Sequence, residues 1–170
     1  MSEIIRIYNG PMPTTAGQVA VTTGTAIKTM LQIKLGTETT RAKVVEWGIS
    51  FNGSAAATPI LCELLTTGTV AATVTAHAAT GIQNRDPLAI TPTDGEPFTI
   101  STTTTGFTST GEGSIIATRM LDCQLIAPTN QYIFQAPLGR EWAFSPLNYL
   151  RIRVTAGAAV NAICYIDVEV

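Results

Sequence analysis

Few side chains in this sequence are suited to acid, base or nucleophilic chemistry. Its 170 residues include one histidine, His77, in the segment Thr75-Ala76-His77-Ala78-Ala79. Catalytic triads and metal sites need partner side chains at recognisable spacings, and no such partners accompany His77 in the sequence. We therefore expect His77 to be exposed or packed under a loop, with no catalytic role.

Two pairs of carboxylates have the i, i+2 spacing that places side chains on one face of a strand, Asp94 with Glu96 and Asp167 with Glu169. Asp94 and Glu96 lie among turn signals, where carboxylates can bind calcium, but the spacing of a calcium loop is missing. For Asp167 and Glu169 we expect a solvated face on the last strand. The sequence predicts no metal site.

Neither a phosphate loop nor a redox or zinc motif is recognisable. Gly111-Glu112-Gly113 lacks the lysine and the wider glycine spacing of a phosphate loop, so it predicts a turn. Cys62, Cys123 and Cys164 stand among apolar neighbours at spacings that fit no zinc module or CxxC motif. We expect buried free thiols, rather than one disulfide and one unpaired cysteine. The sequence predicts neither an enzyme nor a cofactor.

The composition favours strands and gives no sign of a charged partner. Charged residues make up 13% of the chain, about half the usual quarter, while 28 threonines supply neutral, β-branched surface. A net charge of −2 with scattered basic residues predicts no binding to nucleic acid or to a membrane. There is neither a secretory signal nor a run of ~20 apolar residues, so we expect a protein made in the cytoplasm without processing.

Period-two alternation of apolar residues recurs along the chain, and no long helical stripe interrupts it. Eight to ten strands with short turns predict an all-β fold, a single-domain antiparallel β-sandwich or jelly roll with little or no helix, over residues 19–170. Residues 81–97 contain many turn signals and predict a long loop. The expected strands are 27–35, 42–51, 60–65, 69–75, 98–102, 115–126, 131–135, 149–155 and 160–170.

Aromatic residues concentrate in residues 131–144, which hold four of them in a chain that is 6% aromatic. Aromatic and arginine side chains often anchor protein interfaces, so we expect Tyr132, Phe134, Arg140 and Trp142 to contribute to one. The alternative is that Phe134 and Trp142 fill the core. A surface with few charges also makes docking less costly in desolvation.

Five stretches carry a resemblance to a known family: Lys43–Gly53, Ile60–Leu65, Gln135–Glu141, Leu150–Ala156 and Val160–Ile166. Together they resemble small virion proteins of tailed bacteriophages that decorate and stabilise the capsid. The resemblance implies a β-sandwich that forms a homotrimer on the outer capsid surface and bridges neighbouring major capsid protein subunits. Such a protein stabilises the assembled lattice by binding only to it.

Residues 1–18 are predicted to form an N-terminal arm. In this hypothesis Ile4, Ile5, Ile7 and Tyr8 add as a strand to the sheet edge of a neighbour, and the arm contacts the capsid.

The alternative function is a carbohydrate-binding or receptor-binding jelly-roll module, with a glycan as the partner. Its candidate aromatic residues are Trp142, Tyr132 and Tyr149. The two functions are compatible, since a decoration protein can also adhere to glycans.

Overall fold

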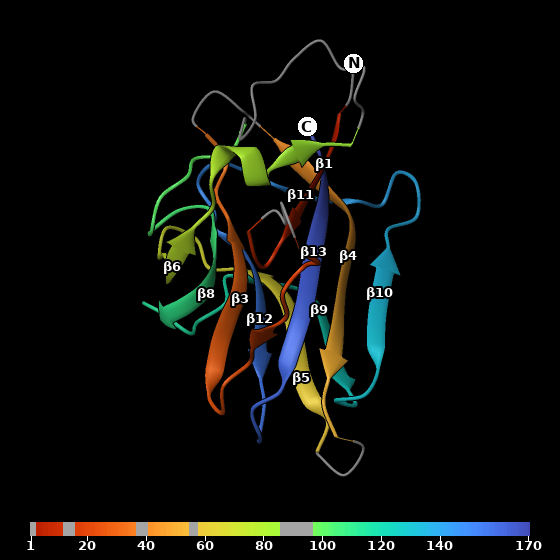
Figure 1. Cartoon of the computed structure of the whole chain (residues 1–170). Coiled ribbons are helices and arrows are strands. Elements are labelled where there is room, and N and C mark those ends of the chain that lie inside the picture. Colours follow the sequence, from red (N-terminus) through yellow and green to blue (C-terminus); the bar gives the residue numbers. More distant parts are fainter. Residues whose placement is uncertain (1–2, 12–15, 37–40, 55–57, 86–96) are drawn as a thin grey trace.

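Two antiparallel sheets packed face to face make up the protein (Figure 1), as the sequence predicts. The computed structural model describes residues 3–11, 16–36, 41–54, 58–85 and 97–170. Within these ranges the only helical element is one short 3-10 turn, η1 (Ala79–Gly81). The described residues form thirteen strands, more than the eight to ten expected.

The first sheet has seven strands, and the last strand of the chain lies near its centre. The strand order is β10-β4-β13-β1-β7, with β11 paired to β4 and β2 paired to β13. The strands are β10 (Gln131–Gln135), β4 (Ala42–Asn52), β13 (Asn161–Glu169), β1 (Ile4–Tyr8), β7 (Gln83–Asn84), β11 (Trp142–Phe144) and β2 (Val21–Thr22).

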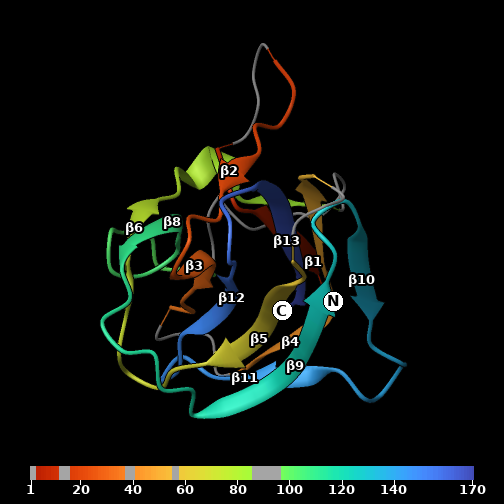
Figure 2. The ribbon, with the colours of Figure 1, turned by 90° about the horizontal axis from the view of Figure 1, so that it is seen from below.

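The second sheet has six strands in the order β6-β8-β3-β12-β5-β9. Its end strand β9 lies beside β10, the end strand of the first sheet, when the sandwich is viewed along its strands (Figure 2). The strands are β6 (Thr73–Ala76), β8 (Gly106–Gly111), β3 (Ile27–Ile33), β12 (Leu150–Thr155), β5 (Ile60–Thr66) and β9 (Arg119–Ile126).

The core fills the space between the sheets with aliphatic side chains and Trp47, which is completely buried. A register shift in the β4–β13 pair places Asp167 opposite Glu46 and Val168 opposite Val44. Val45 is the extra residue of this bulge, so Val44 is buried in the core and Val45 is only partly buried.

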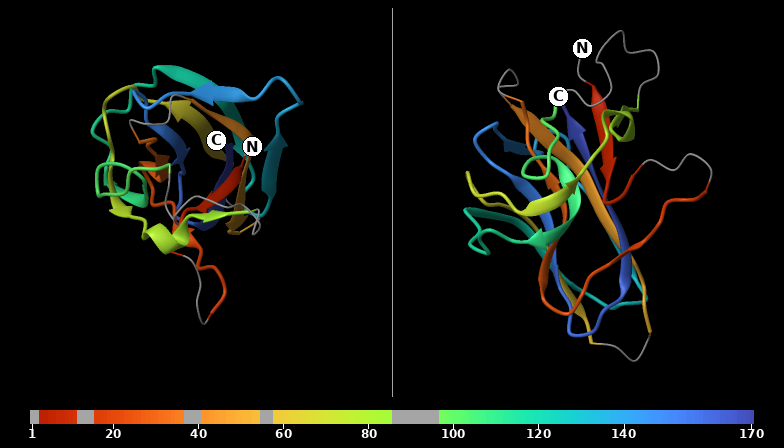
Figure 3. Two further views of the ribbon diagram at one scale, coloured as in Figure 1. Left: turned by 90° about the horizontal axis from the view of Figure 1, so that it is seen from above. Right: turned by 60° about the vertical axis from the view of Figure 1, so that its left-hand side comes forward.

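The prediction of an arm that joins a neighbour's sheet is wrong for β1. Both edges of β1 are occupied within the chain, because it pairs with β13 on one side and β7 on the other. Ile5 and Ile7 are 1% and 0% exposed, since their apolar face completes the core. Residues 16–20, before β2, belong to a segment that projects from the sandwich (Figure 3), although the Gln18 side chain lies against Gly10 after β1. Residues 12–15 lie outside the described ranges.

Two of the other predicted elements differ from the structure. Residues 98–102 form no strand; Phe98 and Ile100 make only isolated bridges, and the strand is β8, a few residues later. Most of the predicted long loop, residues 86–96, lies outside the described ranges, and the calcium ligands considered there, Asp94 and Glu96, lie outside them too.

The outer face of the six-stranded sheet is polar and yet buried. Arg151 and Arg153 on β12 point to this face, opposite Gln32 and Glu63, and all four are at most 6% exposed. They are buried because residues 70–72 and 112–116, here called the cover, lie over them. Arg151 donates to the carbonyl of Val70 at 2.5 Å and to those of Glu112 and Ser114, and Arg153 donates to the carbonyl of Ile115.

Candidate interaction surface

The side chains with catalytic potential are dispersed in the structure. Among the described residues there is no group of three or more His, Cys, Asp or Glu side chains placed to hold a metal ion. The described part of the chain also contains no helix long and apolar enough to cross a membrane.

His77 is packed under the end of β1. It is 3% exposed, its Nε2 donates to the carbonyl of Tyr8 at 2.8 Å, and its ring meets Phe107 edge-on with centroids 4.9 Å apart. Its Nδ1 has no hydrogen-bond partner among the described residues. Burial lowers the pKa of His77 from 6.5 to about 4, because a charged imidazolium would lose its hydration there.

This burial makes the stability of the protein sensitive to mild acid. Between pH 6.5 and 4 the unfolded chain binds a proton at His77 that the folded chain excludes, so the free energy of unfolding falls as the pH falls. We expect a loss of about 2 kcal/mol between pH 7 and pH 5 in urea titrations. The variant His77→Gln should lose most of this dependence, and an identical pH profile for both proteins would refute the assignment.

Asp122 connects the two sheets at their neighbouring edges, β9 and β10. Its Oδ2 accepts hydrogen bonds from Trp47 Nε1 at 3.1 Å and from the Tyr132 hydroxyl at 2.9 Å. Burial, with a further contribution from the hydrogen bond to Asp122, raises the pKa of Tyr132 to about 12. The hydroxyl of Tyr132 is therefore bound within the chain, while its ring is partly exposed.

The other predicted anchors divide between the core and the surface. Phe134 stacks on Trp142 with ring centroids 4.8 Å apart, and both rings are half-buried against the core. Phe134 and Trp142 therefore serve partly as core, the alternative that the sequence left open. Arg140 is exposed in the turn between β10 and β11, beside Leu138, which is 99% exposed.

The outer face of the seven-stranded sheet carries an ion-pair network in place of the expected solvated carboxylates. Asp167 is 2% exposed and accepts from Arg6 Nε at 2.6 Å and from Arg85 Nη1 at 2.8 Å. This contact raises the pKa of Arg6 above its usual value. Tyr8 lies against Tyr165 nearby, and Ile4 is 41% exposed. The expectation of a solvated Asp167 was wrong because two arginines enclose it.

An exposed apolar surface lies on the other sheet. We call it the β9 patch; it consists of Ile115 and Ile116 from the cover and Met120, Cys123 and Leu125 from β9. The exposed fraction is 56% for Ile115, 75% for Ile116, 47% for Met120 and 72% for Leu125.

The parts of the β9 patch are neighbours. Arg153 binds the carbonyl of Ile115 and the carboxylate of Glu63, and Glu63 lies directly opposite Cys123 in the β5–β9 pair. Leu125 and Cys123 point outward because Ile126 and Asp122 point inward.

Sequence reasoning found strand β9 but not its exposed apolar face. The prediction of three buried thiols is correct for Cys62 and Cys164 and wrong for Cys123, which is exposed. Burial raises the pKa of Cys62 to about 12, while Cys123 is on the outward face of an edge strand. The prediction failed because Leu121, Leu125 and Ile126 make this strand look buried, whereas an edge strand at the end of a sandwich is only partly covered.

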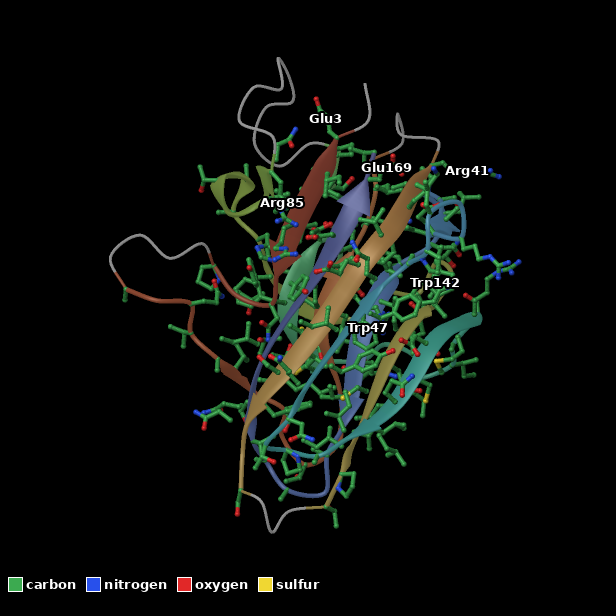
Figure 4. The ribbon with its side chains drawn as sticks, turned by 90° about the vertical axis from the view of Figure 1, so that its right-hand side faces the viewer. Glu3, Arg41, Trp47, Arg85, Trp142 and Glu169 are labelled. Atoms are coloured by element: carbon green, nitrogen blue, oxygen red, sulfur yellow. The ribbon has the colours of Figure 1, made fainter. Side chains whose placement is uncertain are left out.

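An open pocket of about 430 Å³ lies between β11 and β9, and Arg41, Arg119 and Trp142 contribute to its lining. Figure 4 shows Trp142 between β4 and β9, near Arg41 at the start of β4. The pocket and the β9 patch share no residue.

No family model, curated protein or solved structure matches this chain.

Proposed function

We propose that this chain is a structural protein that binds the outer surface of a tailed-phage capsid and stabilises its lattice. The observation that carries the proposal is the β9 patch, since large apolar side chains that gather on an exposed surface often mark an interaction site. The strand sequences that resemble decoration proteins supply the identity of the partner, the major capsid protein.

The physical basis is preferential binding to the assembled state. A protein that binds the assembled lattice but not the separated subunits stabilises the lattice by mass action. We further propose a homotrimer, because three linked copies of the β9 patch turn individually weak contacts into stable attachment. The low density of charge on the surface keeps the desolvation cost of each contact small.

The proposal predicts that charges in the β9 patch abolish capsid binding. The double variant Ile116→Lys/Leu125→Lys should bind expanded empty capsids roughly 100-fold more weakly in co-sedimentation, because two lysines would lose their hydration at the contact. Val19 is similarly exposed, at 66%, but precedes β2 on the other sheet, so Val19→Lys is the matched control and should bind normally.

Light scattering on a sizing column measures the proposed trimer independently. A monomer that does not sediment with capsids would overturn the proposal. Equal binding by the double variant and the wild-type protein would show that the β9 patch is not the contact.

The alternative function, a carbohydrate-binding or receptor-binding module, has one observation in its favour, the pocket beside Trp142. The other two candidate aromatic residues, Tyr132 and Tyr149, are less suited to binding a glycan. The Tyr132 hydroxyl is bound to Asp122, and the Lys34 ammonium lies over the ring of Tyr149, 4.5 Å from its centroid.

A further inference from the structure

We infer that the pocket between β9 and β11 binds an acidic saccharide, a pyranose ring that carries a carboxylate. Its volume of about 430 Å³ is within the range of small-molecule sites. The inference deepens the alternative function and does not depend on capsid binding.

The two arginines in the pocket lining form no ion pair with a described residue. Four of the seven arginines, Arg6, Arg85, Arg151 and Arg153, form ion pairs with carboxylates. The other three, Arg41, Arg119 and Arg140, are exposed and form no ion pair with any described residue. Two of these three line the same pocket, although the chain as a whole is slightly acidic.

Among the described residues of the pocket lining Glu141 is the one carboxylate, and its own loop donates a hydrogen bond to it. Glu141 Oε1 accepts a hydrogen bond from the Gly139 amide at 2.8 Å, and backbone hydrogen bonds of this loop lower the pKa of Glu141. Its negative charge is therefore stabilised by the β10–β11 turn, and together with Arg41 and Arg119 it leaves the described lining with one net positive charge. The guanidinium groups of Arg41 and Arg119 remain available for an incoming carboxylate, which arginine binds in a planar, bidentate manner.

The rest of the lining suits a sugar ring better than a bare anion. Trp142 presents an aromatic surface whose other side is supported by Phe134, and Leu121 and Phe144 add apolar area. Aromatic rings pack well against the C–H face of a pyranose, since the π face is negative and the C–H groups are weakly positive. A phosphate or sulfate ion would use the arginines and leave this apolar surface exposed.

Polar groups at one end of the pocket can bind sugar hydroxyls. Asn148 donates from Nδ2 to the Ser145 hydroxyl at 3.2 Å, and both residues line the pocket. The hydrogen bond fixes the amide and directs its carbonyl oxygen, an acceptor, away from Ser145. Aromatic support, two arginines in the lining and a fixed amide together favour a carboxylated pyranose over a neutral one.

The chain carries its own reporter for the test. It contains two tryptophans, and the indole N–H signals of Trp142, in the pocket, and Trp47, in the core, can be followed separately by NMR. We expect glucuronate or N-acetylneuraminate to shift the Trp142 signal and leave that of Trp47 in place. Glucose should bind at least about tenfold more weakly, because it lacks the carboxylate.

Arginine variants separate recognition from general charge effects. Arg119→Gln should weaken glucuronate binding at least about tenfold, whereas Arg140→Gln, the matched control outside the pocket, should stay within about twofold of the wild-type protein. No shift of Trp142 with either acidic sugar would overturn the inference. Equal binding of glucose, or an equal Trp142 shift with inorganic phosphate, would overturn it too.

The sugar-binding test and the capsid-binding test can fail independently of each other. Arg119→Gln should still bind capsids, and the Ile116→Lys/Leu125→Lys variant should still bind glucuronate, because the pocket and the β9 patch have no residue in common.

Discussion

Replacement of Arg153 by methionine is expected to lower the free energy of unfolding by about 3–5 kcal/mol, a large part of the 5–15 kcal/mol typical of a domain. Arg153 binds Glu63 through two hydrogen bonds, at 2.9 and 3.2 Å, and both side chains are at most 7% exposed. Methionine would leave the Glu63 carboxylate buried without a counter-ion and the carbonyl of Ile115 without its donor. Guanidinium chloride titrations measure the difference.

The double variant Arg153→Met/Glu63→Leu is the control for this interpretation. Apolar side chains of similar volume often replace a buried ion pair at little cost, so the double variant should recover most of the lost stability. A loss below about 1 kcal/mol for Arg153→Met would show that the pair contributes little, as exposed pairs do. A double variant no more stable than the single one would mean that packing, and not the unpaired charge, causes the loss.

The fold was largely predictable from the sequence because most of its strands carry a local signal. Alternation in 131–135 and 160–170 identified β10 and β13 with bounds close to those observed. The very short strands β2, β7 and β11 were missed, since two or three residues contain no period and pair only because a longer strand lies beside them. The bulge at Val45 was also not predictable, because it depends on the register with β13.

The candidate surface was less predictable, because it depends on which chain segments lie over a sheet. Arg151 and Arg153 alternate with the core residues of β12, and only the cover, which no local pattern reveals, makes them buried. The sequence did contain one indication that this face of the sheet is buried. Glu63 stands within the apolar run Ile60–Leu65, and a continuous apolar run indicates a strand buried on both faces, where a charge needs a partner.

The buried arginines of β12 also hold in place the part of the β9 patch that the cover provides. Ile115 and Ile116 belong to the cover, a segment without regular secondary structure whose backbone carbonyls are held by arginine side chains. The apolar side chains can face outward because the polar backbone of the same segment is bound inward. The hydrogen bonds between these arginines and the cover therefore determine whether the β9 patch keeps its shape.

The variant Arg151→Met tests this dependence directly. Arg151 is fully buried and donates to the carbonyls of Val70, Glu112 and Ser114. Hydrogen bonds from a charged donor are worth about 1.5–3 kcal/mol each and are not additive, so we expect a total loss of about 3 kcal/mol. The loss should be local, because the core side chains of β12 are unchanged. Hydrogen exchange should accelerate most in residues 70–72 and 112–116.

Arg140→Met is the matched control, because Arg140 is an exposed arginine whose side chain contacts no cover carbonyl. It should leave stability and hydrogen exchange unchanged. Arg151→Met should weaken capsid binding although it alters no residue of the β9 patch, since it releases the backbone that presents Ile115 and Ile116. If exchange in the cover becomes faster while capsid binding is undiminished, binding does not depend on the order of the cover. The contact would then lie on β9 alone, at Met120 and Leu125.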